Sequence, residues 1–146
     1  MTLENLHKIG QLKAHAATRA EIAALLAAAR RSVEDAMKPA NSTETRFICA
    51  YRAVMQCALI AMQASGYRPD TKRPGHDATV LQSLTLTLGV ESARVRVLDK
   101  LREKRNLSDY TGAEVDEVAT QACLEQARGL LREVHAWLQT AHPELA

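Results

Sequence analysis

The sequence contains few of the residues that build β-sheet cores. Only one Phe, one Trp and three Tyr occur among 146 residues, which is 3% of the chain. β-Branched residues rarely cluster, whereas alanine and leucine are abundant. Aromatic and β-branched side chains are enriched in strands, and Ala and Leu are strong helix formers. The composition therefore favours helices over sheets.

Cysteine is also scarce. Cys49, Cys57 and Cys123 are an odd number, contain no CxxC pair and lie inside apolar segments with helical spacing. This pattern excludes a disulfide framework and the common zinc sites. We expect all three to be small core side chains of a protein kept in a reducing compartment.

Motifs of common enzyme classes are absent as well. The chain has no glycine-rich phosphate loop, no GxSxG sequence and no usable Ser/His/Asp order. No two of its histidines stand at HxxxH spacing. The sequence therefore gives no independent basis for a nucleotide hydrolase or an acyl-transfer enzyme, and we expect no metal and no cofactor.

Neither an excess of one charge nor a long apolar run is present. Lys and Arg number 19 against 17 Asp and Glu, a net charge of +2. A balance this even predicts no general attraction to nucleic acid or membranes, so any basic patch has to be local. No segment resembles a signal peptide, and no apolar run approaches the roughly 18 residues of a membrane span. These absences predict a cytoplasmic protein without a membrane partner.

What the chain does contain is a series of apolar residues at helical spacing. This period predicts one domain over residues 1–146, an all-α up-and-down bundle of four to five main helices. The expected helices are a short first one ending near Gly10, then helices over about 19–37, 44–66, 77–88 and 91–112, and a last long helix from about 114 onward.

Two capping boxes mark expected helix starts. Thr18 and Glu21 have the spacing at which a hydroxyl and a carboxylate satisfy the first free amides of a helix, and Thr111 and Glu114 repeat it. The first box predicts the start of the helix over 19–37. The second predicts the start of the last long helix.

Two segments interrupt the helical pattern. Residues 66–77 contain two prolines and two glycines, and the X-Pro steps resist helix, so we expect the longest loop there. Residues 84–88, LTLTL, alternate like a strand. We predict helix for them, because one short strand would have nothing to pair with.

The helix before the last one turns polar near its end. Val97, Leu98 and Leu101 are expected to face inward, and Arg105 continues their stripe one turn later. An arginine withdrawn from water must be paired, because an uncompensated buried charge costs several kcal/mol. Asp109, a further turn along, is within its reach. The alternative is an ordinary ion pair on a solvated helix end, which contributes only a few tenths of a kcal/mol.

Arg105, Asn106, Asp109 and Tyr110 form the pattern RNxxDY. Together with the long central helix and the proline-rich loop, this pattern resembles the HEPN superfamily of helical nucleotide-binding domains. In the active branch of that family an R-x4-6-H motif at a dimer interface makes a metal-independent endoribonuclease. The chemistry needs a cation for the phosphate and a group that moves the 2′-hydroxyl proton. Arg105 matches the arginine, and Tyr110 stands where the histidine could be.

The resemblance implies a role for each candidate side chain. The expected catalytic residues are Arg105, Asp109 and Tyr110, and the expected substrate-binding residues are Asn106, Arg102, Arg52 and His76. The resemblance also implies a homodimer that binds RNA or a nucleotide in a toxin-antitoxin or defence setting, with a cognate antitoxin or a nucleotidyltransferase as partner. The alternative is a non-catalytic helical-bundle module for interaction or dimerisation, in which the polar cluster fixes helix geometry.

Several of these roles depend on how the helices pack. His76 is either an N-cap or exposed loop residue, or it reaches the site from another helix start. Arg52 and Gln56 share a polar strip on the central helix, which either faces water or lines a cleft between helices. Tyr51 and Tyr67 have the chemistry to stack a base, although packing in the core is the usual role of such residues.

Positive charge is concentrated in one region. From Arg94 to Arg105 there are six cations against two acids, and the proline-rich loop adds Arg68, Lys72 and Arg73. If the bundle places loop and helix side by side, these cations form a footprint for RNA or nucleotide phosphate. A solvated helix face explains the same charges without a ligand.

Overall fold

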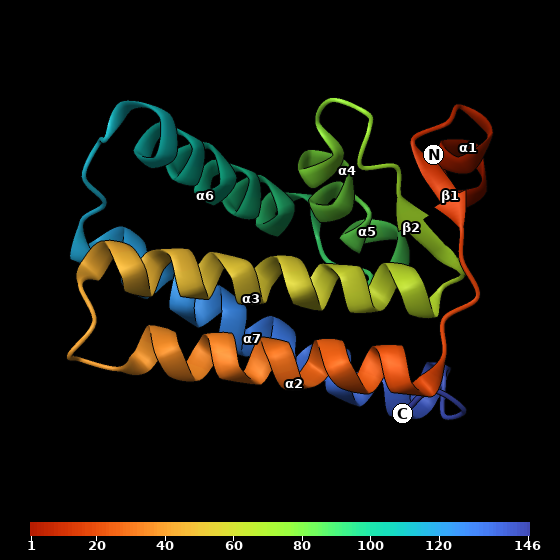
Figure 1. Cartoon of the computed structure of the whole chain (residues 1–146). Coiled ribbons are helices and arrows are strands. Elements are labelled where there is room, and N and C mark those ends of the chain that lie inside the picture. Colours follow the sequence, from red (N-terminus) through yellow and green to blue (C-terminus); the bar gives the residue numbers. More distant parts are fainter.

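The computed structural model describes residues 1–146 and is built mainly of helices (Figure 1). In chain order its elements are α1 (Leu3–Lys8), β1 (Leu12–Ala14), α2 (Arg19–Met37), α3 (Thr43–Ala64), β2 (Tyr67–Pro69), α4 (His76–Gln82), α5 (Leu84–Thr87), α6 (Ser92–Thr111) and α7 (Glu117–Ala141). The long helices are α2, α3, α6 and α7. The predicted all-α bundle of four to five main helices is confirmed.

Helix α3 is the centre of the core. It packs most extensively against α2 and α7, and α2 runs alongside it in Figure 1. The Ser42 hydroxyl starts the helix by accepting the Thr45 N–H at 3.1 Å. Alanines on α3 allow close approach, while Phe47, Ile60 and Met62 are fully buried. Twelve buried residues belong to α3, more than to any other helix, so its burial contributes strongly to stability.

Helix α6 lies over α3 in a second layer with α4 and α5 (Figure 1). Only four of its residues are buried, namely Val95, Leu98, Leu101 and Ser108. Polar contacts with other helices hold α6 at both of its ends. The Ser108 hydroxyl donates to the Glu44 carboxylate of α3 at 3.3 Å. At the other end Arg94 pairs with Glu133 of α7 at 2.7 Å.

The inward stripe predicted on α6 is wrong at one residue. Val97 is 45% exposed, and Val95 is buried in its place. The inward positions are therefore 95, 98, 101, 105 and 108, which keep the spacing of three and four residues. Arg105 remains on this stripe, as predicted.

A two-stranded antiparallel sheet occurs where no strand was predicted. Strand β1 pairs with β2 so that Leu12 lies opposite Pro69, Lys13 opposite Arg68 and Ala14 opposite Tyr67. β2 lies inside the segment expected to be a loop. Three residues are too few to show a period of two in sequence, and the pairing joins segments more than 50 positions apart.

The capping box predicted at 111–114 is wrong. Helix α6 continues through Thr111 and ends at Gly112, which adopts the left-handed φ of +72° that glycine tolerates best. Helix α7 begins only at Glu117. Its N-cap is Asp116, whose carboxylate accepts a backbone N–H of the first turn at 2.8 Å.

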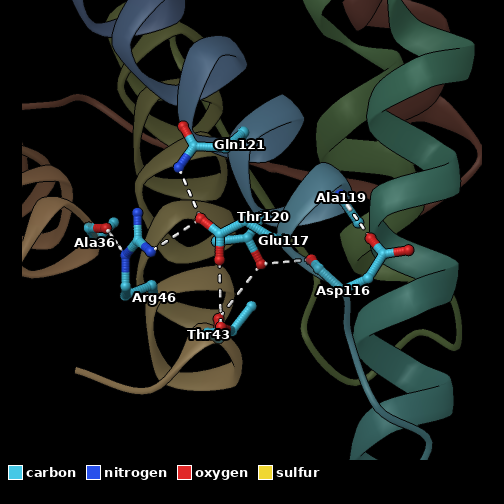
Figure 2. A network of polar contacts seen from close by, with 8 residues as sticks. All are labelled: Ala36, Thr43, Arg46, Asp116, Glu117, Ala119, Thr120 and Gln121. Atoms are coloured by element: carbon cyan, nitrogen blue, oxygen red, sulfur yellow. Dashed lines mark hydrogen bonds and ion pairs between the residues drawn. The ribbon is translucent and has the colours of Figure 1, made fainter. Parts of the chain in front are cut away.

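A polar network explains where α7 begins (Figure 2). The Glu117 carboxylate accepts hydrogen bonds from the Arg46 guanidinium at 3.1 Å and the Thr43 hydroxyl at 3.3 Å. Arg46 also donates to the Ala36 carbonyl at 2.8 Å, and Thr120 donates to the Thr43 carbonyl at 3.4 Å. The network ties the start of α7 to the start of α3 and the end of α2. Its partners are far apart in sequence, so a local capping pattern does not reveal them.

The segment expected as one helix over 77–88 is two short helices. α4 ends at Gln82 and α5 begins at Leu84, with Ser83 between them. The buried Ser83 hydroxyl donates to the Val80 carbonyl at 2.6 Å, a local bond that competes with regular helix. LTLTL is helical in its first four residues, as predicted.

The three cysteines are buried and free, as predicted. Burial raises the pKa of Cys57 to about 12 and that of Cys123 to about 12. Helix α3, which contains two of the cysteines, is the one helix long and apolar enough to cross a membrane by length and composition. In its most apolar window 61% of the residues are buried within the protein, and a buried core helix passes the same test.

The capping box at the start of α2 is confirmed. The Thr18 hydroxyl accepts the Glu21 N–H at 3.1 Å, and the Glu21 carboxylate accepts the Thr18 N–H at 3.0 Å. These bonds lower the pKa of Glu21, with a further contribution from His15. Removing one N-cap hydroxyl costs about 1 kcal/mol. We therefore expect Thr18→Ala to lower the free energy of unfolding by about 1 kcal/mol, measured by urea denaturation.

Thr111→Ala is the matched control for this variant. Thr111 has the same sequence signature but caps no helix, so its removal is expected to change stability by less than about 0.5 kcal/mol. Equal losses in the two variants would contradict the structural distinction between the two boxes.

Candidate phosphate-binding cleft

The second half of α6 meets the start of α4 and the middle of α3, and the junction is hollowed on two sides. One hollow, of about 410 Å³, lies toward α3, and the other, of about 250 Å³, lies toward the start of α4. Both hollows are lined by Asp77 and Arg105. We call the two together the α6 cleft.

The α6 cleft contains all seven side chains predicted for the site. The hollow toward α3 is lined by Arg52, Arg105 and Asp109. The hollow toward α4 is lined by His76, Arg102, Arg105, Asn106 and Tyr110. Residues from three helices thus lie around one guanidinium, that of Arg105.

Arg105 is paired more closely with a residue that the sequence did not suggest. Its Nη2 lies 3.0 Å from Oδ2 of Asp77, whereas its Nε lies 3.8 Å from Oδ2 of Asp109. The predicted pair with Asp109 exists, but it is the longer of the two. Asp77 is the second residue of α4 and is 28 positions away, so helical spacing carries no signal for it.

His76 reaches the α6 cleft from the start of α4. Its Nε2 lies 3.3 Å from Oδ1 of Asp77, and its Nδ1 lies 3.3 Å from the Arg73 carbonyl. Gly75, and not His76, is the N-cap of α4. The two oxygens of Asp77 therefore bridge a histidine and an arginine, His76 on one side and Arg105 on the other.

The ring of Tyr51 packs against the guanidinium of Arg105. The guanidinium carbon lies 4.8 Å from the centroid of the ring, a cation–π contact. The side chain is 3% exposed, and its hydroxyl has no hydrogen-bond partner. Burial raises the pKa of the Tyr51 phenol well above its ordinary value, although Arg105 acts in the opposite direction. Tyr51 thus stacks against an arginine and keeps its proton, and it is not open to a base.

The remaining aromatic candidates lie apart from each other. Tyr67 packs against His7 of α1, with ring centroids 5.6 Å apart, and is no part of the α6 cleft. Tyr110 is 86% exposed at the rim. Of the three, only Tyr110 presents a free ring to solvent.

The two outer arginines of the α6 cleft differ in their partners. Arg102 donates to Asp99 at 2.8 Å, and this hydrogen bond raises the pKa of Arg102. Arg52 is exposed and forms no ion pair. Gln56, predicted to share its polar strip, instead accepts a hydrogen bond from the Ser32 hydroxyl of α2 at 3.0 Å. The strip is therefore divided: Arg52 lines the cleft, and Gln56 faces α2.

The α6 cleft has the components of a phosphate site. Guanidinium groups bind phosphate oxygens in a fixed fork geometry, and an imidazole accepts or donates a proton near neutral pH. An apolar wall from Ile48, Met55 and Leu59 closes the side toward α3. No cluster of ligands suited to a metal ion occurs in the molecule.

The fold and the α6 cleft together define the class of protein: an all-α bundle with a polar, arginine-rich cleft beside one long helix. Comparison with known proteins finds no family model and no curated protein that matches this sequence.

Proposed function

We propose that this is a HEPN-like protein that binds RNA or a nucleotide by its phosphate groups in the α6 cleft. One observation carries the proposal: three arginines and a histidine from three different helices line the same pair of adjoining hollows. Arg52 is the clearest phosphate ligand, because it has no protein partner. A homodimer in a toxin-antitoxin or defence setting, with a cognate antitoxin or a nucleotidyltransferase as partner, belongs to the same proposal.

The proposal extends to metal-independent cleavage of RNA. With its Nε2–H directed at Asp77, His76 accepts the proton of a 2′-hydroxyl on Nδ1, in place of the contact with the Arg73 carbonyl, and the 2′-oxygen attacks the adjacent phosphorus. The bond from phosphorus to the 5′-oxygen breaks, and the leaving oxygen takes a proton from water. Arg105 stabilises the charge that develops on the phosphoryl oxygens. The bridge from His76 through Asp77 to Arg105 supports this assignment, because one carboxylate orients both groups.

A titration with adenosine monophosphate tests the binding proposal. In NMR spectra of the labelled protein we expect the signals of His76, Asn106 and Tyr110 to shift together and to saturate. Arg52→Ala is expected to weaken binding about tenfold, the usual effect of losing one charge-assisted hydrogen bond. Arg31→Ala, which removes an exposed cation of α2, is the control. Shifts scattered over the surface, or equal affinity in both variants, would overturn the proposal.

A second candidate function is a non-catalytic interaction or dimerisation module. The observation that favours it is the pairing of Arg105 with two carboxylates, which already compensates the charge without a ligand. In this reading the polar cluster fixes the position of α6 on α4 and α3.

The two aspartates give this second candidate a quantitative test. Asp77→Asn removes the 3.0 Å ion pair beside the start of α4, where a carboxylate also interacts favourably with the helix dipole. We expect it to lower the free energy of unfolding by about 1 kcal/mol. Asp109→Asn removes the 3.8 Å pair and is expected to cost only a few tenths of a kcal/mol. Thermal unfolding of both variants measures the difference.

The Asp109→Asn variant also separates the two functions. If the α6 cleft binds phosphate, removing a negative charge from its rim strengthens nucleotide binding. If the cleft only fixes helix geometry, nucleotide binding is absent in both proteins, and the variant changes the oligomeric state or the stability alone.

A further inference from the structure

The six cations of α6 between Arg94 and Arg105 fall into two groups. Three of them are bound within the protein: Arg94 to Glu133, Arg102 to Asp99 and Arg105 to Asp77. The other three form no ion pair and are exposed, namely Arg96, Lys100 and Lys104. Arg94 and Arg105 attach α6 to α7 and α4, whereas Arg102 pairs within α6 itself. The second group makes no such attachment.

The unpaired cations form a line. Arg96, Lys100 and Lys104 are spaced by four residues, so they follow one another along the outward side of α6. Successive members are about 6 Å apart along the helix axis, comparable to the separation of successive phosphates in an extended nucleic-acid strand. Asp99, which pairs with Arg102, and Glu103 are the acids beside them. With Arg102 counted, four cations and two acids leave this outward edge with a net charge of +2.

An exposed aromatic ring, that of Tyr110, lies beyond the line of cations on α6. Tyr110 lies about 9 Å beyond Lys104 along the axis and is 86% exposed. Leu107, 56% exposed, lies between them. Tyr110 also lines the hollow of the α6 cleft that contains His76. At about 100° per residue, Tyr110 lies about 40° around the helix from Arg96 and about 120° from Lys104, so a strand that follows the cations crosses the outward face of α6 to reach the ring.

We infer that the outward edge of α6 binds single-stranded RNA, with phosphates along Arg96, Lys100 and Lys104 and a base stacked on Tyr110. This inference rests on the proposed function and specifies its substrate as a strand, not a free nucleotide. One line of cations follows one backbone, and a free tyrosine ring stacks only on a base that is not already paired. The edge spans about 21 Å from Arg96 to Tyr110, room for about four nucleotides.

The experiment measures binding of a fluorescein-labelled oligouridine of about ten nucleotides by fluorescence anisotropy at several salt concentrations. The test variant is R96A/K100A/K104A. Each phosphate contact to a single strand adds about 0.7 to the slope of log affinity against log salt. We expect this slope to fall by about 2 and the affinity to fall on the order of 100-fold at about 0.1 M salt.

The matched control is R31A/R128A/R132A, which removes the same charge from exposed, unpaired positions on α2 and α7. Its slope is expected to stay close to that of the wild type. Tyr110→Ala is expected to weaken binding at least about fivefold, whereas Tyr110→Phe, which keeps the stacking face, retains it. Equal slopes for the two triple variants would overturn the inference.

Further outcomes separate this inference from the proposed function. If adenosine monophosphate binds in the α6 cleft but the oligouridine binds no more tightly, the proposed function stands and the strand path is wrong. If neither binds, both are wrong. If a duplex of the same length or polyglutamate binds as tightly as the oligouridine and with the same dependence on the three cations, the edge recognises negative charge alone. That result also overturns the inference.

Discussion

Replacing Arg105 by alanine is expected to weaken phosphate binding by at least about tenfold and to destabilise the fold. Arg105 is the one residue that lines both hollows of the α6 cleft from α6. A hydrogen bond to a charged group contributes about 1.5–3 kcal/mol, which corresponds to about 10- to 100-fold in affinity. The same change leaves the Asp77 carboxylate without its cation and uncovers the Tyr51 ring. A stability loss of about 1–2 kcal/mol follows.

Two further variants separate binding from folding. Arg105→Lys keeps the charge but loses the planar fork and the stacking on Tyr51, so we expect intermediate affinity with most of the stability retained. Arg31→Ala removes an exposed charge far from the α6 cleft and is expected to change neither. Anisotropy with the labelled oligouridine and thermal unfolding measure the two effects. Wild-type affinity in a folded Arg105→Ala protein would remove Arg105 from the proposed site.

Phe47→Ala is expected to cause the largest loss of stability. Phe47 is the only phenylalanine in the chain and is 0% exposed on α3, the helix that packs against both α2 and α7. Truncating a buried Phe to Ala removes its transfer free energy and leaves a cavity, at a cost of about 3–5 kcal/mol. Stabilities of natural domains are about 5–15 kcal/mol, so this loss is a large fraction of the total.

Urea denaturation measures the effect. We expect the urea concentration at the midpoint to fall, with little change in the slope of the free energy of unfolding against urea concentration. Leu107→Ala is the control, because Leu107 is 56% exposed on α6 and its truncation is expected to cost less than about 0.5 kcal/mol. A loss below about 1 kcal/mol in Phe47→Ala would contradict the packing of α3 in the core. Both variants leave the α6 cleft intact, so phosphate binding is expected to persist wherever they are folded.

The expected effects differ between the paired and the unpaired cations of α6. Arg94 and Arg105 hold the helix at its two ends through partners on α7 and α4. Variants of these two residues are expected to change stability. Variants of the unpaired cations are expected to change only binding.

The sequence by itself determined the long helices and where most of them begin and end. The helical period of α3, the capping box at Thr18 and the left-handed stop at Gly112 are local, because each depends on residues within a few positions of one another. The sequence also identified the α6 segment of the cleft, because Arg105 interrupts an apolar stripe. These features require no knowledge of how the helices pack.

Tertiary structure alone decided which residues meet across the α6 cleft. Asp77 pairs with Arg105 across 28 positions, and Arg105 covers Tyr51 across 54. The β1–β2 pairing and the start of α7 at Glu117 likewise depend on partners distant in the chain. Such contacts depend on how apolar burial sets the helices against one another. No period or spacing encodes them, and they bring His76 and Arg105 to the two oxygens of the Asp77 carboxylate.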